Sequence, residues 1–165
     1  MSRLNRIDLP TAGRLAIAAR PRAEDWLAED IAAWVGEGIA VVVSLLEQAE
    51  VHDLGLRREA ALCEGHGMVF VSFPIPDRRL PDSRSAAVRL AEGLAVRLTE
   101  GETVLIHCRA GIGRSAVIAA CVMIRLGIDG AEAFDRIAAA RGVRVPDTED
   151  QREWVRAFER KQIDQ

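Results

Sequence analysis

The segment 107–115 combines a cysteine, two glycines and two arginines at short spacings, in the order His-Cys-Arg-Ala-Gly-Ile-Gly-Arg-Ser. Gly111 and Gly113 allow the backbone to turn so that successive amides point into one concavity, an arrangement that binds anions. Arg114 adds a planar guanidinium that can bind two oxygens of one phosphate group. Cys108 lies in the same positive field, which favours the thiolate form of a cysteine. The segment therefore predicts a phosphate-binding loop that carries a nucleophilic cysteine.

The elements on either side of this loop must hold it in place. The compact run 103–107 predicts a strand, and 113–126 predicts a helix. Parallel sheets place their ligand sites at such strand-to-helix junctions, and the helix N-terminus adds partial positive charge. A Walker-type nucleotide loop is disfavoured, because no lysine follows the second glycine.

The rest of the chain alternates strand-like and helical patterns, which predicts an α/β fold. We expect one domain over residues 1–165, with a central, mostly parallel sheet of about four strands flanked by helices. The expected strands are 15–19, 39–46, 68–75 and 103–107. The expected helices are 24–34, 54–63, 83–98, 113–126, 130–140 and 148–161, with Asp82 or Ser83 capping the third. Trp26, Trp34 and Trp154 are expected in the core.

The loop pattern His-Cys-x5-Arg-Ser resembles the signature of cysteine-dependent protein tyrosine and dual-specificity phosphatases. The small size is similar to the compact, cyclin-dependent-kinase-inhibitor-like bacterial branch. The resemblance extends from about residue 13 to about residue 158, but only the loop is highly specific. It implies a phosphatase-like fold and metal-independent hydrolysis of phosphomonoesters through a phosphocysteine intermediate, with no cofactor.

Each position of the loop then receives an expected role. Cys108 is the nucleophile, Ser115 donates a hydrogen bond to the sulfur and helps it leave, and His107 orders the loop. The expected phosphate-binding positions are Arg109, Ala110, Gly111, Ile112, Gly113 and Arg114.

Phosphoryl transfer also needs a general acid, which the family supplies from an aspartate on a loop after a strand. Asp77 follows Pro76 in the matching place, although Ile75 stands where the family usually has tryptophan. Asp82 is the rival, but a helix N-cap explains it sufficiently. We therefore expect Asp77 to be the acid.

Other polar residues have weaker patterns. Gln151 matches a glutamine that positions the hydrolytic water in relatives, yet it also completes a capping box in Thr-Glu-Asp-Gln, and both readings stay open. Cys63 and Cys121 are expected to be buried, inert thiols. His52 and His66 have no partners at metal-ligand spacing, so no metal site is expected.

The charge pattern bears on partners and compartment. The net charge is −3, and the arginines are scattered among acids, so no nucleic-acid partner is expected. No apolar run is long enough to span a membrane and no secretory signal is recognisable, which predicts a cytoplasmic protein without membrane contact. The expected partner is a phosphorylated protein or a small phosphomonoester.

Three alternative functions stay open at this point. The first is a phosphoinositide or inositol phosphate phosphatase, whose relatives carry lysines at loop positions that Arg109 and Ile112 hold here. The second is a rhodanese-like sulfurtransferase, since that class also places a cysteine on an anion-binding loop. The third is a binding module that reads phosphate without catalysis.

Overall fold

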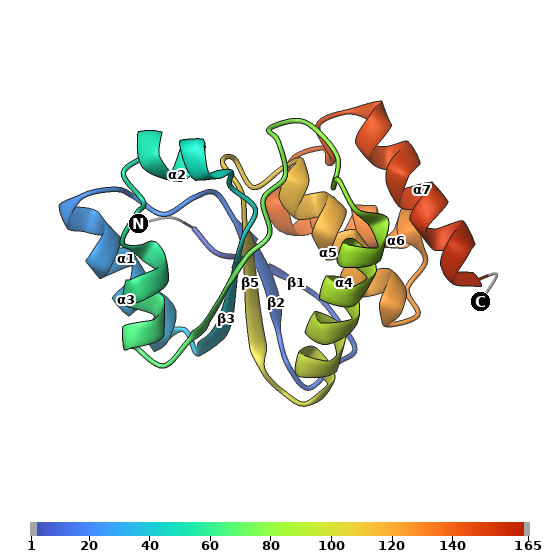
Figure 1. The fold of residues 1–165 in the computed structure, drawn as a ribbon. Helices are drawn as coiled ribbons and strands as arrows, with labels where there is room; N and C mark the ends of the chain where they lie inside the picture. Colours follow the sequence, from blue (N-terminus) through green and yellow to red (C-terminus); the bar gives the residue numbers. More distant parts are fainter. Residues whose placement is uncertain (1–2, 164–165) are drawn as a thin grey trace.

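A five-stranded sheet runs through the centre of the computed structural model, which describes residues 3–163 (Figure 1). The strand order is β1-β2-β5-β3-β4, and the last four strands in this order are parallel to one another. Their bounds are β1 Asn5–Ile7, β2 Leu15–Ala18, β3 Ile39–Ser44, β4 Val69–Ser72 and β5 Thr103–His107. The predicted α/β fold with a mostly parallel sheet is confirmed.

The sheet has one strand more than expected, because β1 adds an antiparallel edge beside β2. This strand is only three residues long and alternates a buried asparagine, an exposed arginine and a buried isoleucine. Asn5 compensates for its burial by donating from Nδ2 to the carbonyl of Ile17, at 3.2 Å. So short and polar a run has no recognisable strand pattern in the sequence.

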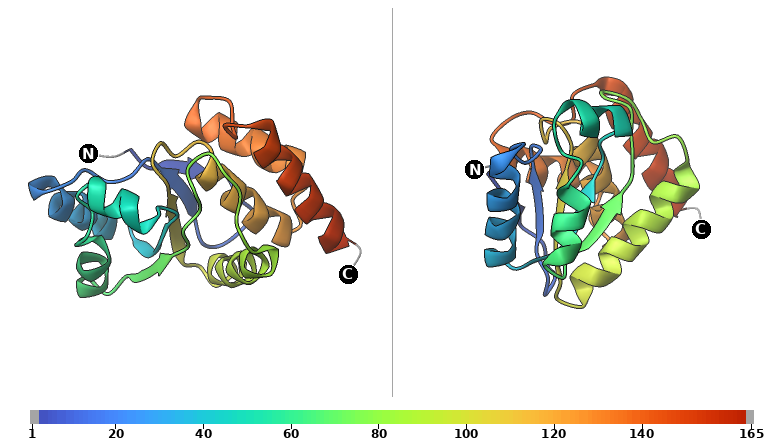
Figure 2. Two further views of the ribbon diagram at one scale, coloured as in Figure 1. Left: turned by 45° about the horizontal axis from the view of Figure 1, so that its top comes forward. Right: turned by 60° about the vertical axis from the view of Figure 1, so that its left-hand side comes forward.

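Helices cover both faces of the sheet, as Figures 1 and 2 show. One face carries α1 and α3, and the other carries the four helices from α4 to α7. The bounds are α1 Asp25–Gly36, α2 Gln48–Asp53, α3 Glu59–Gly65, α4 Arg84–Thr99, α5 Arg114–Arg125, α6 Gly130–Arg141 and α7 Glu149–Ile163. No helix in this described range is long and apolar enough to cross a bilayer.

The predicted helix over residues 54–63 is wrong in its bounds, because the helix here, α3, covers only residues 59–65. A further helix that was not expected, α2, precedes it and starts with a capping box between Glu47 and Glu50. Gly55, with φ of 70°, takes a left-handed conformation and separates α2 from α3. The consequence for the site is that Glu50 and Glu59 lie on different helices.

The core forms two layers, because alternate residues of the central strands face opposite sides of the sheet. Val41 and Val43 pack with the layer of α4 to α7, whereas Val42 packs with α1 and α3. Trp34 is buried as expected, but Trp26 is not, with 55% of its surface exposed. Its indole lies on the surface beneath the guanidinium of Arg22, 4.7 Å from the ring centroid.

Two glycines give a matched test of this packing. Gly13 donates to the carbonyl of Leu98 at 2.8 Å, and a Cβ on it would overlap the carbonyl oxygens of Leu98 and Glu102. We expect Gly13→Ala to lower the free energy of unfolding by about 2 kcal/mol in urea denaturation. Gly93, inside α4, has open space around its Cα, so Gly93→Ala should raise it by about 0.5–1 kcal/mol. Equal effects of the two substitutions would contradict this account.

Candidate active site

The predicted loop joins the end of β5 to the start of α5. Gly111 has φ of 72°, which an L side chain rarely adopts, and its amide donates to Cys108 Sγ at 3.2 Å. The cysteine is 3% exposed and lies at the base of the turn. The sulfur therefore already accepts a backbone hydrogen bond, which stabilises negative charge on it.

Neighbouring segments bind the outer carbonyls of this loop. Arg141 at the end of α6 donates from Nε to the carbonyl of Gly111 at 3.0 Å and from Nη2 to that of Ala110 at 3.1 Å. The amide of Arg20 donates to the carbonyl of Arg109 at 3.2 Å. Because these carbonyls are bound on the outside, the turn is held open around its concavity. Arg141 was not predicted as a site residue, since an arginine in the last turn of a helix is ordinary.

Arg114 is 2% exposed and is bound by three segments of the chain. Its Nη1 donates to Glu50 Oε2 at 2.8 Å, to the carbonyl of Ile75 at 2.9 Å and to that of Leu45 at 3.5 Å. Its Nη2 lies 3.0 Å from Asp77 Oδ1 as an ion pair, yet it donates no hydrogen bond within the described chain. One nitrogen is thus fully anchored, and the other stays available to a ligand.

The guanidinium of Arg114 keeps its positive charge despite its burial. Burial acts to lower the pKa of Arg114, but the hydrogen bond to Glu50 and the nearby Cys108 and Asp77 raise it above its ordinary value. Glu50 was not foreseen as a site residue, because its helix was not predicted.

The two candidate acids differ in position. Asp77 lies on the loop between β4 and α4, is 49% exposed and reaches Arg114. Asp82 is exposed and forms no described hydrogen bond or ion pair. Ser83 is the N-cap of α4, accepting from the amide of Ala86 at 3.1 Å. The structure therefore brings Asp77, and not Asp82, to the loop.

Gln151 is fully buried and makes both the expected cap and a longer contact. The backbone amide of Gln151 donates to Thr148 Oγ1 at 3.1 Å, and its side-chain Oε1 accepts from the backbone amide of Thr148 at 3.2 Å. Its Nε2 donates to the carbonyl of Arg79 at 3.2 Å, which ties α7 to the loop of Asp77. A Cβ on Gly113 would lie 3.1 Å from Gln151 Oε1, so this side chain lies beside the N-terminus of α5. Its catalytic role stays a prediction.

Ser115 and His107 flank the loop on its two sides. The hydroxyl of Ser115 is buried and has no hydrogen-bond partner among the described residues. His107 is also buried, and its Nε2 lies 2.5 Å from Oε1 of Glu59, which was not predicted as a site residue. Of the remaining predicted positions, Ile112 is partly buried and packs against the core.

The other thiols and histidines lie away from this chemistry. Burial raises the pKa of Cys63 to about 12, with a smaller contribution from Glu59, and burial raises the pKa of Cys121 as well. The prediction of two buried, inert thiols is therefore supported. His52 and His66 are exposed. No group of three or more His, Cys, Asp or Glu within residues 3–163 could hold a metal ion.

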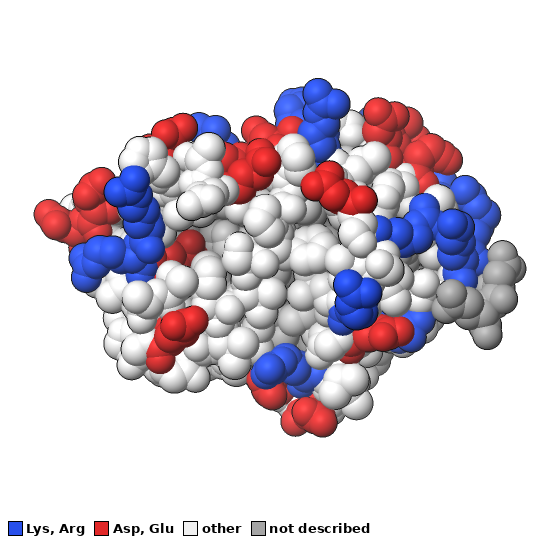
Figure 3. Space-filling model, viewed as in Figure 1, with Lys and Arg blue, Asp and Glu red and all other residues white. Residues whose placement is uncertain are grey.

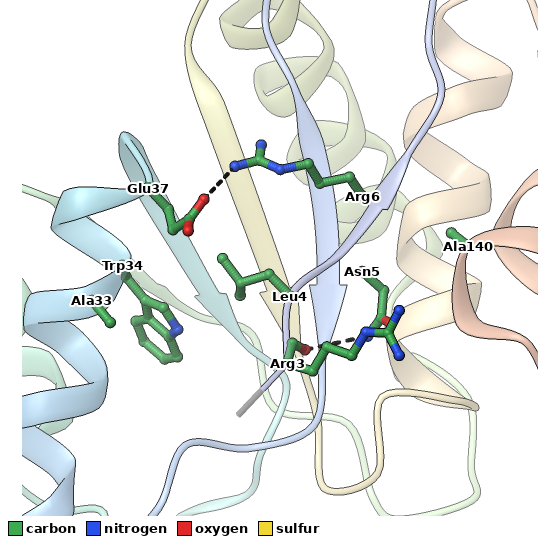
Figure 4. Close-up of a pocket in the computed structure, with 8 residues that line it drawn as sticks. All are labelled: Arg3, Leu4, Asn5, Arg6, Ala33, Trp34, Glu37 and Ala140. Atoms are coloured by element: carbon green, nitrogen blue, oxygen red, sulfur yellow. Dashed lines mark hydrogen bonds and ion pairs between the residues drawn. The ribbon is translucent and has the colours of Figure 1, made fainter. Parts of the chain in front are cut away.

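A pocket of about 570 Å³ lies away from the loop, between α1, β1 and the end of α6 (Figure 4). Arg6 and Glu37 form an ion pair of 2.7 Å in its wall, and Trp34 also lines it. None of the loop residues contributes to this pocket. Figure 3 shows acidic and basic side chains interspersed around an uncharged centre, consistent with the scattered charges of the sequence.

The fold and the loop define the class of cysteine-dependent tyrosine and dual-specificity phosphatases. The family described as "PTP-SAK: Swiss Army Knife protein, DSP-PTPase phosphatase domain" matches residues 5–165, and the chain belongs to it. The resemblance inferred from the loop is confirmed.

Individual relatives agree with this assignment. The chain is 34% identical over 99 residues to cyclin-dependent kinase inhibitor 3 of Rattus norvegicus, covering 59% of this chain and 46% of the relative. It is 32% identical over 94 residues to the Homo sapiens protein of that name, covering 56% and 44%. The match thus spans about half the length of these curated relatives.

Solved structures share the fold over nearly the whole chain. A kinase associated phosphatase with its catalytic cysteine replaced by serine superposes with a TM-score of 0.89 at 22% identity, covering 97% of this chain and 95% of that one. The active form of Tk-PTP gives 0.75 at 30% identity, covering 95% and 96%.

Two glycines with the same φ test the loop. At Gly111 a Cβ would lie 2.5–2.7 Å from backbone atoms of Ala18 and Ala19, so Gly111→Ala must move the turn. We expect the affinity for orthovanadate, measured by isothermal calorimetry, to fall at least about tenfold, because the amides lose their convergence. Gly142, also at 72°, has open space, so Gly142→Ala should only lower the free energy of unfolding by about 1 kcal/mol. Unchanged vanadate affinity in Gly111→Ala would contradict the prediction.

Proposed function

We propose that this chain hydrolyses phosphomonoesters through a phosphocysteine intermediate, with phosphotyrosine, phosphoserine or phosphothreonine in proteins as its substrates. The observation that carries the proposal is the convergence of three groups on one loop. Cys108 Sγ accepts an amide hydrogen bond, Arg114 is anchored through only one of its terminal nitrogens, and Asp77 pairs with the other. These are a nucleophile, a phosphate-binding cation and a proton donor.

Substrate binding replaces a contact that the free protein makes with itself. Nη2 of Arg114 pairs with Asp77, and a phosphate monoester is a stronger partner for it because it carries more negative charge than one carboxylate. Nη1 keeps its bonds to Glu50 and to the carbonyl of Ile75. Phosphate binding therefore releases the carboxyl of Asp77 to the leaving oxygen without loosening the guanidinium.

In the first half-reaction the thiolate of Cys108 attacks phosphorus, and the bond between phosphorus and the ester oxygen breaks. Asp77, as the carboxylic acid, gives its proton to the departing oxygen. The amides from Arg109 to Arg114 and the guanidinium stabilise the charge on the equatorial oxygens. The product is an alcohol or phenol, and phosphocysteine remains.

In the second half-reaction water attacks the phosphorus of phosphocysteine. The carboxylate of Asp77 takes a proton from this water as the phosphorus–sulfur bond breaks. The hydroxyl of Ser115, buried and without another partner, donates to the sulfur as it regains its charge. Inorganic phosphate leaves, and the thiolate is restored.

The alternatives are less well supported by the same residues. A rhodanese-like sulfurtransferase or a phosphate-reading module has no use for an acid beside the anion-binding arginine. A phosphoinositide or inositol phosphate phosphatase would use the same chemistry, so only a comparison of substrates distinguishes it from a protein phosphatase. Of the two loop positions that carry lysine in such relatives, Arg109 keeps a basic side chain and Ile112 does not.

The substitution Cys108→Ser tests the nucleophile and the substrate class together. We expect the wild-type chain to release phosphate from a phosphotyrosine peptide or a phosphoserine peptide faster than from phosphoinositide vesicles. Cys108→Ser should lower every rate roughly 10⁴-fold or more while phosphopeptide binding persists. Retained turnover would exclude phosphocysteine, and preference for the vesicles would move the proposal to lipid substrates.

The pair Asp77→Asn and Asp82→Asn tests the general acid. We expect Asp77→Asn to lower kcat on a phosphopeptide about 10²–10⁴-fold and to remove the basic limb of the pH profile, because the amide has no proton to give. Asp82→Asn, on the same segment, should leave both unchanged. If Asp82→Asn had the larger effect, the assignment of Asp77 would be wrong.

A further inference from the structure

A carboxylate that the phosphatase chemistry described above does not use lies against the phosphate-binding loop. A Cβ on Gly113 would lie 2.3 Å from Oδ2 and 2.9 Å from Cγ of Asp147. The carboxylate therefore fills the space that a side chain on Gly113 would need. Asp147 belongs to the connection between α6 and α7, so the packing of these helices delivers a negative charge to the loop residue that precedes Arg114.

The fold makes no visible use of this carboxylate. Asp147 is exposed and forms no hydrogen bond or ion pair with any residue from 3 to 163. Gln151 lies beside the same Cα of Gly113, but its side chain accepts from the amide of Thr148 and donates to a carbonyl of the Asp77 loop. A structural role thus accounts for Gln151 and not for Asp147.

The position of Asp147 opposes the binding of anions. The loop amides and the N-terminus of α5 offer partial positive charge to a phosphate group, and an unpaired carboxylate against Gly113 acts in the opposite direction. Every substrate of the loop carries the phosphate that reacts. The repulsion therefore distinguishes substrates by the charges that surround this phosphate, and it grows with the number of those charges.

The basic side chains around the loop leave this charge unpaired. Arg79 lies close in the fold, since its carbonyl accepts from Gln151 Nε2, but its guanidinium is exposed and forms no described ion pair. Arg109, beside Cys108, is also exposed and has no described ion pair. The two ends of the loop therefore carry opposite charges, basic at Arg109 and acidic where Asp147 contacts Gly113.

We propose that Asp147 is a specificity-determining residue, which favours phosphoproteins with basic residues beside the phosphorylated one and disfavours substrates that carry several phosphate groups. The inference rests on the proposed function, because it names the substrates of the same loop. A lysine or arginine of the substrate forms an exposed ion pair with Asp147. A second phosphate group in that place faces a carboxylate instead, which is a repulsive element of specificity.

Three phosphotyrosine peptides, identical except for two lysines, two alanines or two glutamates beside the phosphotyrosine, test this proposal. We expect the wild-type kcat/KM to be about tenfold higher for the lysine peptide than for the glutamate peptide. Asp147→Asn should reduce this ratio about three- to tenfold, because one charge is removed from an exposed site. Its kcat/KM on the alanine peptide should change less than about twofold. In about 1 M salt the effect on the ratio should shrink, since exposed charges are then screened.

Asp150→Asn is the matched control, since Asp150 lies three residues further on, is exposed and forms no described hydrogen bond or ion pair. It should leave the ratio unchanged. An unchanged ratio in Asp147→Asn, or an equal change in Asp150→Asn, would overturn the proposal. A fall of kcat/KM by the same factor on all three peptides would also overturn it, because such a fall indicates a catalytic or structural role.

Two binding measurements extend the test beyond turnover. Inositol tetrakisphosphate should inhibit Asp147→Asn at a concentration about three- to tenfold lower than wild type, and equal inhibition of the two would contradict the proposal. Calorimetry of the three peptides with Cys108→Ser, alone and combined with Asp147→Asn, should give the same dependence of affinity on charge. If this dependence holds but the wild-type chain hydrolyses none of the peptides, the proposed function fails and the role of Asp147 stands.

Discussion

The burial of one guanidinium constrains most of the site. Arg114 starts α5, yet its bonds go to the end of β3, to α2 and to the segment after β4. Removing a partner from a buried cation strongly destabilises the folded protein. These three segments therefore have to meet at the carboxyl edge of the sheet. The loop of Cys108, the loop of Asp77 and α2, which carries Glu50, are therefore brought together by the contacts of Arg114.

The parts of the site that are local in sequence could be predicted from it. Gly111, Gly113 and Arg114 lie within a few residues of Cys108, so their spacing alone defines an anion-binding turn. Of the four parallel strands, β2, β3 and β5 were recognisable because strands buried on both faces have continuous apolar runs. The fourth, β4, is partly exposed and was recognisable from its β-branched and aromatic residues. Asp77 required the family resemblance in addition, since an aspartate after a proline is otherwise an ordinary turn residue.

The parts supplied by distant elements could not be predicted. Glu50, Glu59 and Arg141 are ordinary charged residues on helices, and only the packing of those helices aims them at the loop. The helix predicted over residues 54–63 starts too early because Gly55, in a left-handed conformation, lies between α2 and α3, and α2 itself is too short to give a recognisable pattern. Trp26 was misplaced because a cation–π contact with Arg22 lets a large aromatic side chain remain on the surface.

The bond from Gln151 to the carbonyl of Arg79 has a consequence for the order in which the site is completed during synthesis. Translation delivers the strands, Cys108 and Asp77 well before α7. A nascent chain that has already paired β5 with β2 and β3 still lacks the hydrogen bond from Gln151 to the loop of Asp77. The residue that makes this contact also caps α7 through Thr148. The helix that fixes the loop of Asp77 is thus synthesised some seventy residues after that loop.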